Sequence, residues 1–345
     1  MLNKPELLVF AKRYNRHKPD QIGGAIRLSE ELIDDLITME EPHTVIDINP
    51  ANYGGFARSY LAVLGKSLKQ MGKHKYILFM GSDRVVLYLV PSLMIIAFLY
   101  SRRIFLKKIG GGFDKIYEKG GWLKKTLIRW VIKNVVITFF ETKHHVAYFE
   151  KFGTTMWFPN VRNASNTSID KRAYDKRFAF ISHVKNDKGI IEILQAVNQL
   201  DNSYRIHIYG PIIDLEVPQD LKPVFDLVYK GPLRPEEVLE TINSYDVILL
   251  PTYYVGEGYP GILIEAYTMS KPVITTKWNS IPEIVEDYQT GILVEPGNSE
   301  ELTRAIEWFN IENYGQLSSQ ALKYAAQFDS FYQTSDKLKI IKAYE

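Results

Sequence analysis

The length, composition and charge of the chain limit what it can be. At 345 residues it exceeds what one hydrophobic core usually covers, so two domains are expected. It contains no cysteine, which excludes a disulfide framework, a thiolate metal site and a cysteine nucleophile. The net charge of +2 is unevenly placed, with +11 on residues 1–162 and −9 on the remainder. A basic first half suggests an anionic partner and an acidic second half argues against a general nucleic-acid binder, although surface charge can also be uneven without any partner.

Short apolar runs alternate with amphipathic stretches through the first half. The runs predict strands at residues 7–10, 44–48, 76–80, 103–107 and 135–139. Strands that alternate with helices predict a parallel sheet. Gly23 and Gly24 precede a helix expected over residues 28–37, where two glycines let the backbone approach a ligand closely. A plain strand-to-helix turn is the alternative.

Two segments of the first half raise the question of a membrane. Residues 85–100 are strongly apolar but fall short of the roughly 20 residues that span a bilayer. We therefore expect a buried helix there and keep a membrane span as the alternative. A helix expected over 122–133 places Lys125, Arg129 and Lys133 on one face. Such a helix can lie on an anionic membrane, or pack its apolar side on the core, which we favour.

Nothing in the sequence requires a metal ion or another cofactor. There is no cluster of His and Cys, and no D-x-D lies at a convincing strand end. Asp34 and Asp35 are expected on a helix, where they would face solvent. The start of the chain lacks the apolar core of a signal peptide, and together with the absence of cysteine this suits the cytoplasm.

The second half resumes the same alternation after a polar stretch. Residues 159–175 lack periodicity and predict a linker between domains. Strands are then expected at 177–181, 206–210, 227–233, 246–251 and 272–276. The loop that joins the first of them to a helix over 190–200 contains His183, Lys185 and Lys188.

The stretch that begins at Gly256 carries the most specific chemistry. It follows an expected strand and precedes a helix, so it lies at the carboxyl edge of the sheet, where open α/β sheets bind ligands. Pro260 suits the first helical position. The amides of Gly261 and Ile262 would then be unpaired donors which, with the helix dipole, favour an anion such as a diphosphate.

Two carboxylates flank this predicted anion site. Glu257 precedes the helix, and Glu265 lies inside it on the same face as the first amides. Each can accept hydrogen bonds from sugar hydroxyls. A phosphate site between two carboxylates suits a nucleotide diphosphate sugar.

The same stretch resembles a known motif. Glu257 and Glu265, with seven residues between them in the setting Gly-Glu-Gly-Tyr-Pro-Gly-Ile-Leu-Ile-Glu-Ala, are similar to the E-x7-E motif of retaining GT-B glycosyltransferases of family 4 (group 1). The resemblance continues through residues 271–274, 281–285 and 291–297. It covers the second half of the chain and, more weakly, the first.

The resemblance implies a fold and a domain organisation. The fold class is α/β, with two doubly wound parallel-sheet, Rossmann-like domains that face a cleft. Residues 1–162, joined by a C-terminal helix at about 330–345, would bind the acceptor. Residues 163–329 would bind the nucleotide sugar.

The resemblance also assigns site residues. Lys188 matches the lysine of a G-R-L-x-x-x-K-G loop that clamps the diphosphate. His183 stands where that loop has arginine, and histidine is only partly charged near neutrality. Lys185 could therefore substitute for the arginine. Catalytic roles fall to Glu257, Lys188 and His183. The residues expected at the donor are Gly24, Lys188, Gly210, Gly231, Leu233, Gly258, Tyr259, Pro260, Gly261, Ile262 and Glu265. The family often has a histidine near the sheet edge at Gly110–Gly112; none is near in this sequence, so a histidine role there is in doubt.

The implied function is transfer of a hexose from a UDP- or GDP-sugar to a hydroxyl of a saccharide acceptor, with retention of configuration. A lipid-linked acceptor, as in bacterial surface polysaccharide, capsule or lipopolysaccharide assembly, would suit the basic first half, as would peripheral contact with the inner face of the plasma membrane. Alternatives on the same fold are an epimerase, a phosphorylase and a non-catalytic nucleotide-sugar binder.

Overall fold

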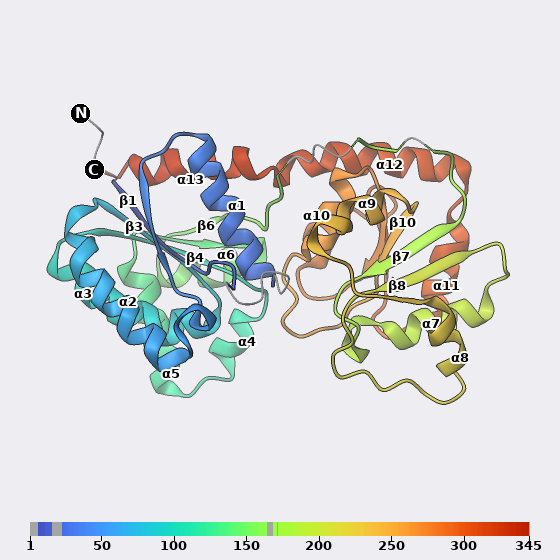
Figure 1. The fold of residues 1–345 in the computed structure, drawn as a ribbon, viewed down its shortest axis with the longest axis horizontal. Coiled ribbons are helices and arrows are strands. Elements are labelled where there is room, and N and C mark those ends of the chain that lie inside the picture. Colours follow the sequence, from blue (N-terminus) through green and yellow to red (C-terminus); the bar gives the residue numbers. More distant parts are fainter. Residues whose placement is uncertain (1–5, 16–22, 164–167, 171, 345) are drawn as a thin grey trace. The chain divides into compact units, whose positions relative to one another are not determined.

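The structure, a computed structural model, describes residues 6–15, 23–163, 168–170 and 172–344. The chain divides into two compact units (Figure 1). Unit 1 comprises Met1–Asn163 and Asp329–Glu345, and unit 2 comprises Ala164–Phe328. In the sequence, unit 2 therefore lies between the two segments that form unit 1.

Unit 1 is built on a six-stranded parallel sheet in the order β2-β1-β3-β4-β5-β6. Its strands are β1 (Leu7–Ala11), β2 (His43–Asp47), β3 (Tyr76–Gly81), β4 (Arg103–Lys108), β5 (Ile137–Phe140) and β6 (Thr155–Trp157). The five expected strands are present, and β6 is too short to show a sequence pattern. Because β2 and β3 lie on opposite sides of β1, the strand order reverses there, which is where such sheets bind ligands.

Helices cover both faces of this sheet. They are α1 (Gly24–Thr38), α2 (Phe56–Gln70), α3 (Val90–Leu99), α4 (Phe113–Glu118), α5 (Trp122–Asn134), α6 (Lys143–Phe149) and α13 (Ser330–Lys342). Buried side chains of α1 and α13 join the core on one face, and those of α2, α3 and α5 join the core on the other. Adjacent residues of β4 divide between the cores, Phe105 facing α1 and Leu106 facing α3, because strand side chains alternate.

The expectation that Asp35 faces solvent is wrong. Asp35 is buried, and its Oδ2 accepts hydrogen bonds from Ser330 Oγ at 2.5 Å and Thr334 Oγ1 at 2.7 Å. Burial raises the pKa of this carboxyl, and the two hydroxyls oppose the rise. Asp35 therefore ties α1 to α13, a contact that local sequence pattern does not reveal, whereas Asp34 is exposed as expected.

A second buried charge lies on the same face of the sheet. Lys107 of β4 is 1% exposed, and its Nζ lies 3.2 Å from the centre of the Phe158 ring. Within the described part of the chain its Nζ has no hydrogen-bond partner. Burial lowers the pKa of Lys107 to about 7, because an amine away from water favours its neutral form.

The apolar stretch 85–100 is helical, but only one side of it is buried. It consists of a π-helical turn, Val85–Leu89, followed by α3. Leu93, Met94 and Ala97 are buried, whereas Ile95 and Leu99 are exposed. The expectation of a buried helix is therefore correct for the inner side alone. Within the described residues no helix is both long and apolar enough to cross a bilayer.

Unit 2 is built on a second six-stranded parallel sheet, in the order β12-β11-β10-β7-β8-β9. Its strands are β7 (Arg177–Ile181), β8 (Arg205–Tyr209), β9 (Tyr229–Gly231), β10 (Val247–Leu250), β11 (Val273–Thr276) and β12 (Gly291–Val294). Its helices are α7 (Ile190–Gln199), α8 (Lys222–Val228), α9 (Val238–Asn243), α10 (Gly261–Thr268), α11 (Ser299–Trp308) and α12 (Ile311–Ala325). Taken in chain order the six strands follow the doubly wound arrangement 6-5-4-1-2-3, whose order reverses between β7 and β10.

One strand prediction in unit 2 is wrong in part. Residues 227–233 were expected to form a strand, but Leu227 and Val228 end helix α8 and only Tyr229–Gly231 is extended. Phe225 and Val228 of α8 are buried. A short apolar run does not distinguish a strand from a buried helical turn, which explains the error.

Candidate functional site

The candidate site lies where the strand order of unit 2 reverses. β7 and β10 are neighbours, and the loops that follow them contain Lys188 and Glu257. Gly189 lies where these two loops meet. Its φ of +78° favours glycine, and a Cβ there would come within 2.3 Å of the Pro251 carbonyl oxygen. The loop after β7 therefore packs directly on the loop after β10.

Lys188 and Glu257 form an ion pair at this point, through Nζ and Oε2, with side chains 10% and 11% exposed. Thr252, fully buried, donates from Oγ1 to the same Oε2 at 3.0 Å. The sequence predicts both charged residues at the donor but does not predict that they pair with each other. An ammonium and a carboxylate so placed can meet a phosphate and a sugar hydroxyl respectively.

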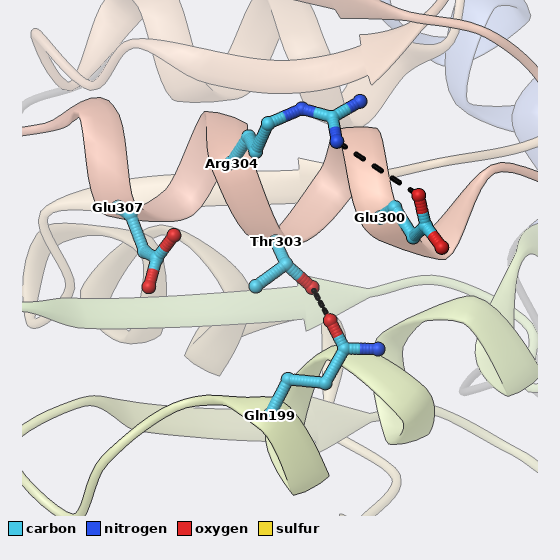
Figure 2. Close-up of a pocket in the computed structure, with 5 residues that line it drawn as sticks. All are labelled: Gln199, Glu300, Thr303, Arg304 and Glu307. Atoms are coloured by element: carbon cyan, nitrogen blue, oxygen red, sulfur yellow. Dashed lines mark hydrogen bonds and ion pairs between the residues drawn. The ribbon is translucent and has the colours of Figure 1, made fainter.

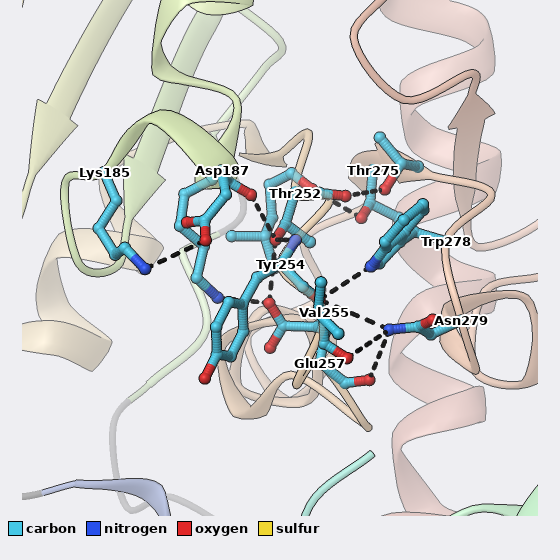
Figure 3. A network of polar contacts seen from close by, with 12 residues as sticks. Lys185, Asp187, Thr252, Tyr254, Val255, Glu257, Thr275, Trp278 and Asn279 are labelled. Atoms are coloured by element: carbon cyan, nitrogen blue, oxygen red, sulfur yellow. Dashed lines mark hydrogen bonds and ion pairs between the residues drawn. The ribbon is translucent and has the colours of Figure 1, made fainter. Parts of the chain in front are cut away.

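A set of polar contacts fixes the loop that carries Glu257. Trp278 Nε1 donates to the Tyr254 carbonyl at 2.8 Å, and Asn279 Nδ2 donates to the carbonyls of Val255 at 3.2 Å and Glu257 at 3.3 Å (Figure 3). Sequence analysis missed these two residues and Thr252. The only signal in the sequence is the asparagine itself. Asn279 has a φ of +46°, a conformation that asparagine tolerates better than most residues.

The cationic side of the site contains two lysines and a histidine. Tyr254 lies between the lysines, with its ring centre 4.9 Å from Lys185 Nζ and 5.1 Å from Lys188 Nζ. Lys185 also pairs with Asp187 at 3.1 Å. Partial burial, Lys188 and Lys185 lower the pKa of His183, against a smaller opposing effect of Glu257. His183 is therefore mostly neutral at pH 7, and the permanent positive charge belongs to the lysines.

Helix α10 begins beside this cluster without a side-chain cap. Pro260 is its N-cap residue, and no side-chain hydrogen bond caps the first turn. Gly261 and Ile262 are half-buried in that turn, and Glu265 is half-buried one turn later. The start of α10 can therefore present amide donors to an anion, as the sequence predicts.

Tyr259 and Gly258, by contrast, are buried. The Tyr259 ring is 2% exposed, and its hydroxyl donates to Glu283 Oε2 at 2.6 Å. The expected donor contact of Tyr259 is therefore not supported for its side chain, which holds the segment at residues 281–283 against α10.

The other glycines expected at the donor have local structural explanations. Gly210 has a φ of +138°, and a Cβ there would lie 1.7 Å from the Ser182 carbonyl oxygen. Gly231 has a φ of +88° with open space around it, and Leu233 nearby is half-buried. Gly24 belongs to unit 1, where it is exposed in the first turn of α1.

Histidines do reach the glycine-rich edge of unit 1, contrary to the expectation that none is near. Asp114, which follows Gly110–Gly112, accepts from His144 Nε2 at 3.0 Å and from His145 Nε2 at 3.1 Å. Both histidines come from α6, some 30 residues further along the chain, so a search of the local sequence misses them. Burial lowers the pKa of His145, which is 1% exposed.

A separate surface pocket of unit 2 lies away from this cluster. Its lining residues are Gln199, Glu300, Thr303, Arg304 and Glu307, from the end of α7 and from α11 (Figure 2). None of them belongs to the predicted site. No group of His, Asp and Glu that could hold a metal occurs among the described residues.

Two doubly wound units, each built on a six-stranded parallel sheet, are the architecture of the GT-B fold. A published structure with this fold, HepE from Anabaena in complex with UDP, superimposes with a TM-score of 0.73 at 15% identity, covering 98% of this chain and 100% of that one. A complex of HepE with UDP-glucose gives 0.69. Residues 175–309 match the family described as glycosyl transferases group 1.

Two curated relatives are named as glycosyltransferases. The D-inositol 3-phosphate glycosyltransferase of Mycobacteroides abscessus is 24% identical over 190 residues, which are 52% of this chain and 42% of the relative. The putative teichuronic acid biosynthesis glycosyltransferase TuaC of Bacillus subtilis is 27% identical over 139 residues, 40% of this chain and 34% of the relative. The chain spans less than half the length of these two relatives.

Proposed function

We propose that the protein transfers a hexose from a nucleotide diphosphate sugar, with UDP or GDP as the nucleotide, to a hydroxyl of a saccharide acceptor with retention of configuration. The observation that carries the proposal is the meeting of Lys188 and Glu257 at the strand reversal of unit 2, beside the uncapped start of α10. The complexes of HepE with UDP and UDP-glucose support a UDP-sugar as the donor.

The proposed roles follow from charge. Negative charge grows on the departing diphosphate as the glycosidic bond breaks, and donors aimed at developing charge commonly make the largest catalytic contribution. Lys188, supported by Lys185, and the first amides of α10 would supply these donors. Glu257 would hold sugar hydroxyls and stabilise positive charge at the anomeric carbon, and Glu265 would hold the ribose.

We further propose that the acceptor carries a phosphate and is linked to a lipid. Lys12 and Arg84 follow β1 and β3, the adjacent strands at which the order of the first sheet reverses. Burial and the nearby Arg84 lower the pKa of Lys12, so two cations stand close enough to repel, and a bound anion would relieve that repulsion. Such an acceptor places the protein in the cytoplasm at the inner face of the plasma membrane.

The proposal is tested by donor binding and by turnover. UDP, GDP and ADP are compared by thermal shift, where a tight ligand raises the melting temperature by mass action. Lys188→Ala and Glu257→Ala should then lose most acceptor-dependent release of nucleotide while circular dichroism shows the fold retained. Retained release in both variants would overturn the assigned roles, and release that needs no acceptor would indicate a different reaction.

A further inference from the structure

Helix α3 of unit 1 is apolar on the side that faces away from its core. The helix reads VPSLMIIAFL and contains no charged residue. Ile95, Phe98 and Leu99 are 58%, 42% and 76% exposed, and their spacing of three and four residues places them on one side. A surface helix normally turns polar side chains outward, whereas a helix that is apolar all round is normally covered.

This exposed side continues onto the two neighbouring helices. The Tyr100 hydroxyl, just after α3, donates to the Leu68 carbonyl of α2 at 3.2 Å. Phe98 contacts the Trp130 ring of α5 edge to face, with centroids 6.2 Å apart. Helices α2, α3 and α5 cover the same face of the sheet (Figure 1). We call this surface the outer face, defined by Leu68, Ile95, Phe98, Leu99, Tyr100 and Trp130.

The charge around the outer face is almost entirely positive. Residues 56–134, which contain all three helices, hold 16 Lys and Arg but three Asp and Glu, and Lys107 and Lys108 of strand β4 are the two cations among them that are buried. Each of the three acids has a partner, since Asp83 pairs with Lys108, Asp114 with His144 and His145, and Glu118 accepts from Tyr148. Exposed cations are next in sequence to two of its residues, Lys69 to Leu68 and Arg129 to Trp130.

We infer that the outer face docks on an anionic phospholipid bilayer, with its apolar side chains in the headgroup region and the flanking cations against lipid phosphates. Apolar side chains with Trp and Tyr, bordered by Lys and Arg, are the composition of a membrane-surface site. A second copy of this chain fits less well, because a two-fold interface would bring two sets of like charges together. The inference rests on the proposed function only for the presence of a membrane at the site of action.

Flotation with vesicles tests the inference without any assay of activity. Wild-type protein should float with vesicles that contain phosphatidylglycerol and remain below with phosphatidylcholine alone. Ile95→Gln/Leu99→Gln should bind the anionic vesicles at least about tenfold more weakly, since it removes two apolar side chains from the contact. Lys69→Ala and Arg129→Ala should each weaken binding by roughly fivefold, and added salt should weaken it further.

The matched control is Leu227→Gln/Ile311→Gln, which changes two side chains of unit 2 that are 70% and 66% exposed and should leave flotation unchanged. Thermal shift with UDP should be the same for all variants, so loss of docking is distinguished from loss of the donor site. Equal flotation of wild type and Ile95→Gln/Leu99→Gln would overturn the inference. A wild-type dimer that this double variant dissociates, seen by sedimentation, would overturn it too and assign the outer face to a second copy.

Discussion

Replacing Glu257 by glutamine tests the ion pair with Lys188 most directly. Both side chains are about nine-tenths buried, so the variant leaves the ammonium beside a neutral amide with little access to water. Breaking a buried pair from one side costs about 3–5 kcal/mol, and the position of this pair at the open edge of a sheet favours the lower value. At about 2–4 °C per kcal/mol for a unit of this size, we expect a fall in melting temperature of about 6–12 °C.

The same variant should bind UDP more tightly although it transfers sugar poorly. In the free protein the Glu257 carboxylate neutralises Lys188 and would also repel an incoming diphosphate. Two unit charges about 6 Å apart interact by about 3 kcal/mol at an effective dielectric constant of 20. Solvent and salt reduce this value, so we expect affinity to rise by about tenfold, or 1.4 kcal/mol, as measured by isothermal titration calorimetry.

Two control variants separate the pair from its surroundings. Thr252→Val removes the hydroxyl that donates to Glu257 but keeps both charges, and should cost about 1 kcal/mol with little change in UDP affinity. Glu300→Gln removes a carboxylate of unit 2 that is 78% exposed and should change neither quantity. The reasoning fails if Glu257→Gln melts like the wild type or binds UDP more weakly than it.

Three further predictions concern positions outside the ion pair. Lys107→Met should raise the melting temperature at pH 7. The wild type should also gain stability from pH 7 to 10 while the variant does not. Over this range the unfolded chain holds a proton that the buried amine, with a pKa of about 7, has released. Asp35→Ala should lower the stability of unit 1 by about 2–4 kcal/mol in urea unfolding, since it leaves two buried hydroxyls without an acceptor, whereas Asp34→Ala at the exposed neighbouring position should change it little. Gly189→Ala should destabilise unit 2 and reduce UDP binding in calorimetry, because its Cβ would displace the Pro251 carbonyl; a variant that binds like the wild type would show that the two loops need not pack together.

The sequence predicts the strands and the carboxyl-edge position of the site because both depend on local patterns. The run before Pro251 and the glycine-rich turn after it are sufficient to place Glu257 at a strand-to-helix junction. The approach of Lys188 to Glu257 depends instead on β7 and β10 being neighbours, although the residues are 69 positions apart. No periodic pattern in the sequence reveals that β7 and β10 are neighbours.

The errors have the same origin. Asp35 was expected to face solvent because its helix was considered alone, yet α13, almost 300 residues away, covers it. His144 and His145 reach Asp114 only because α6 packs beside α4. The exposed side of α3 was expected to be buried because hydrophobicity reports how apolar a segment is and not what covers it.

The return of the chain to unit 1 sets an order for events on the ribosome. Residues 164–328 form a complete unit of their own, and domains generally fold as they emerge. Helix α13, which is made afterwards, then covers the face of the first sheet that holds Asp35 and Lys107. The first part of the chain to be synthesised is therefore the last to be finished, and until then its exposed apolar face is available to chaperones.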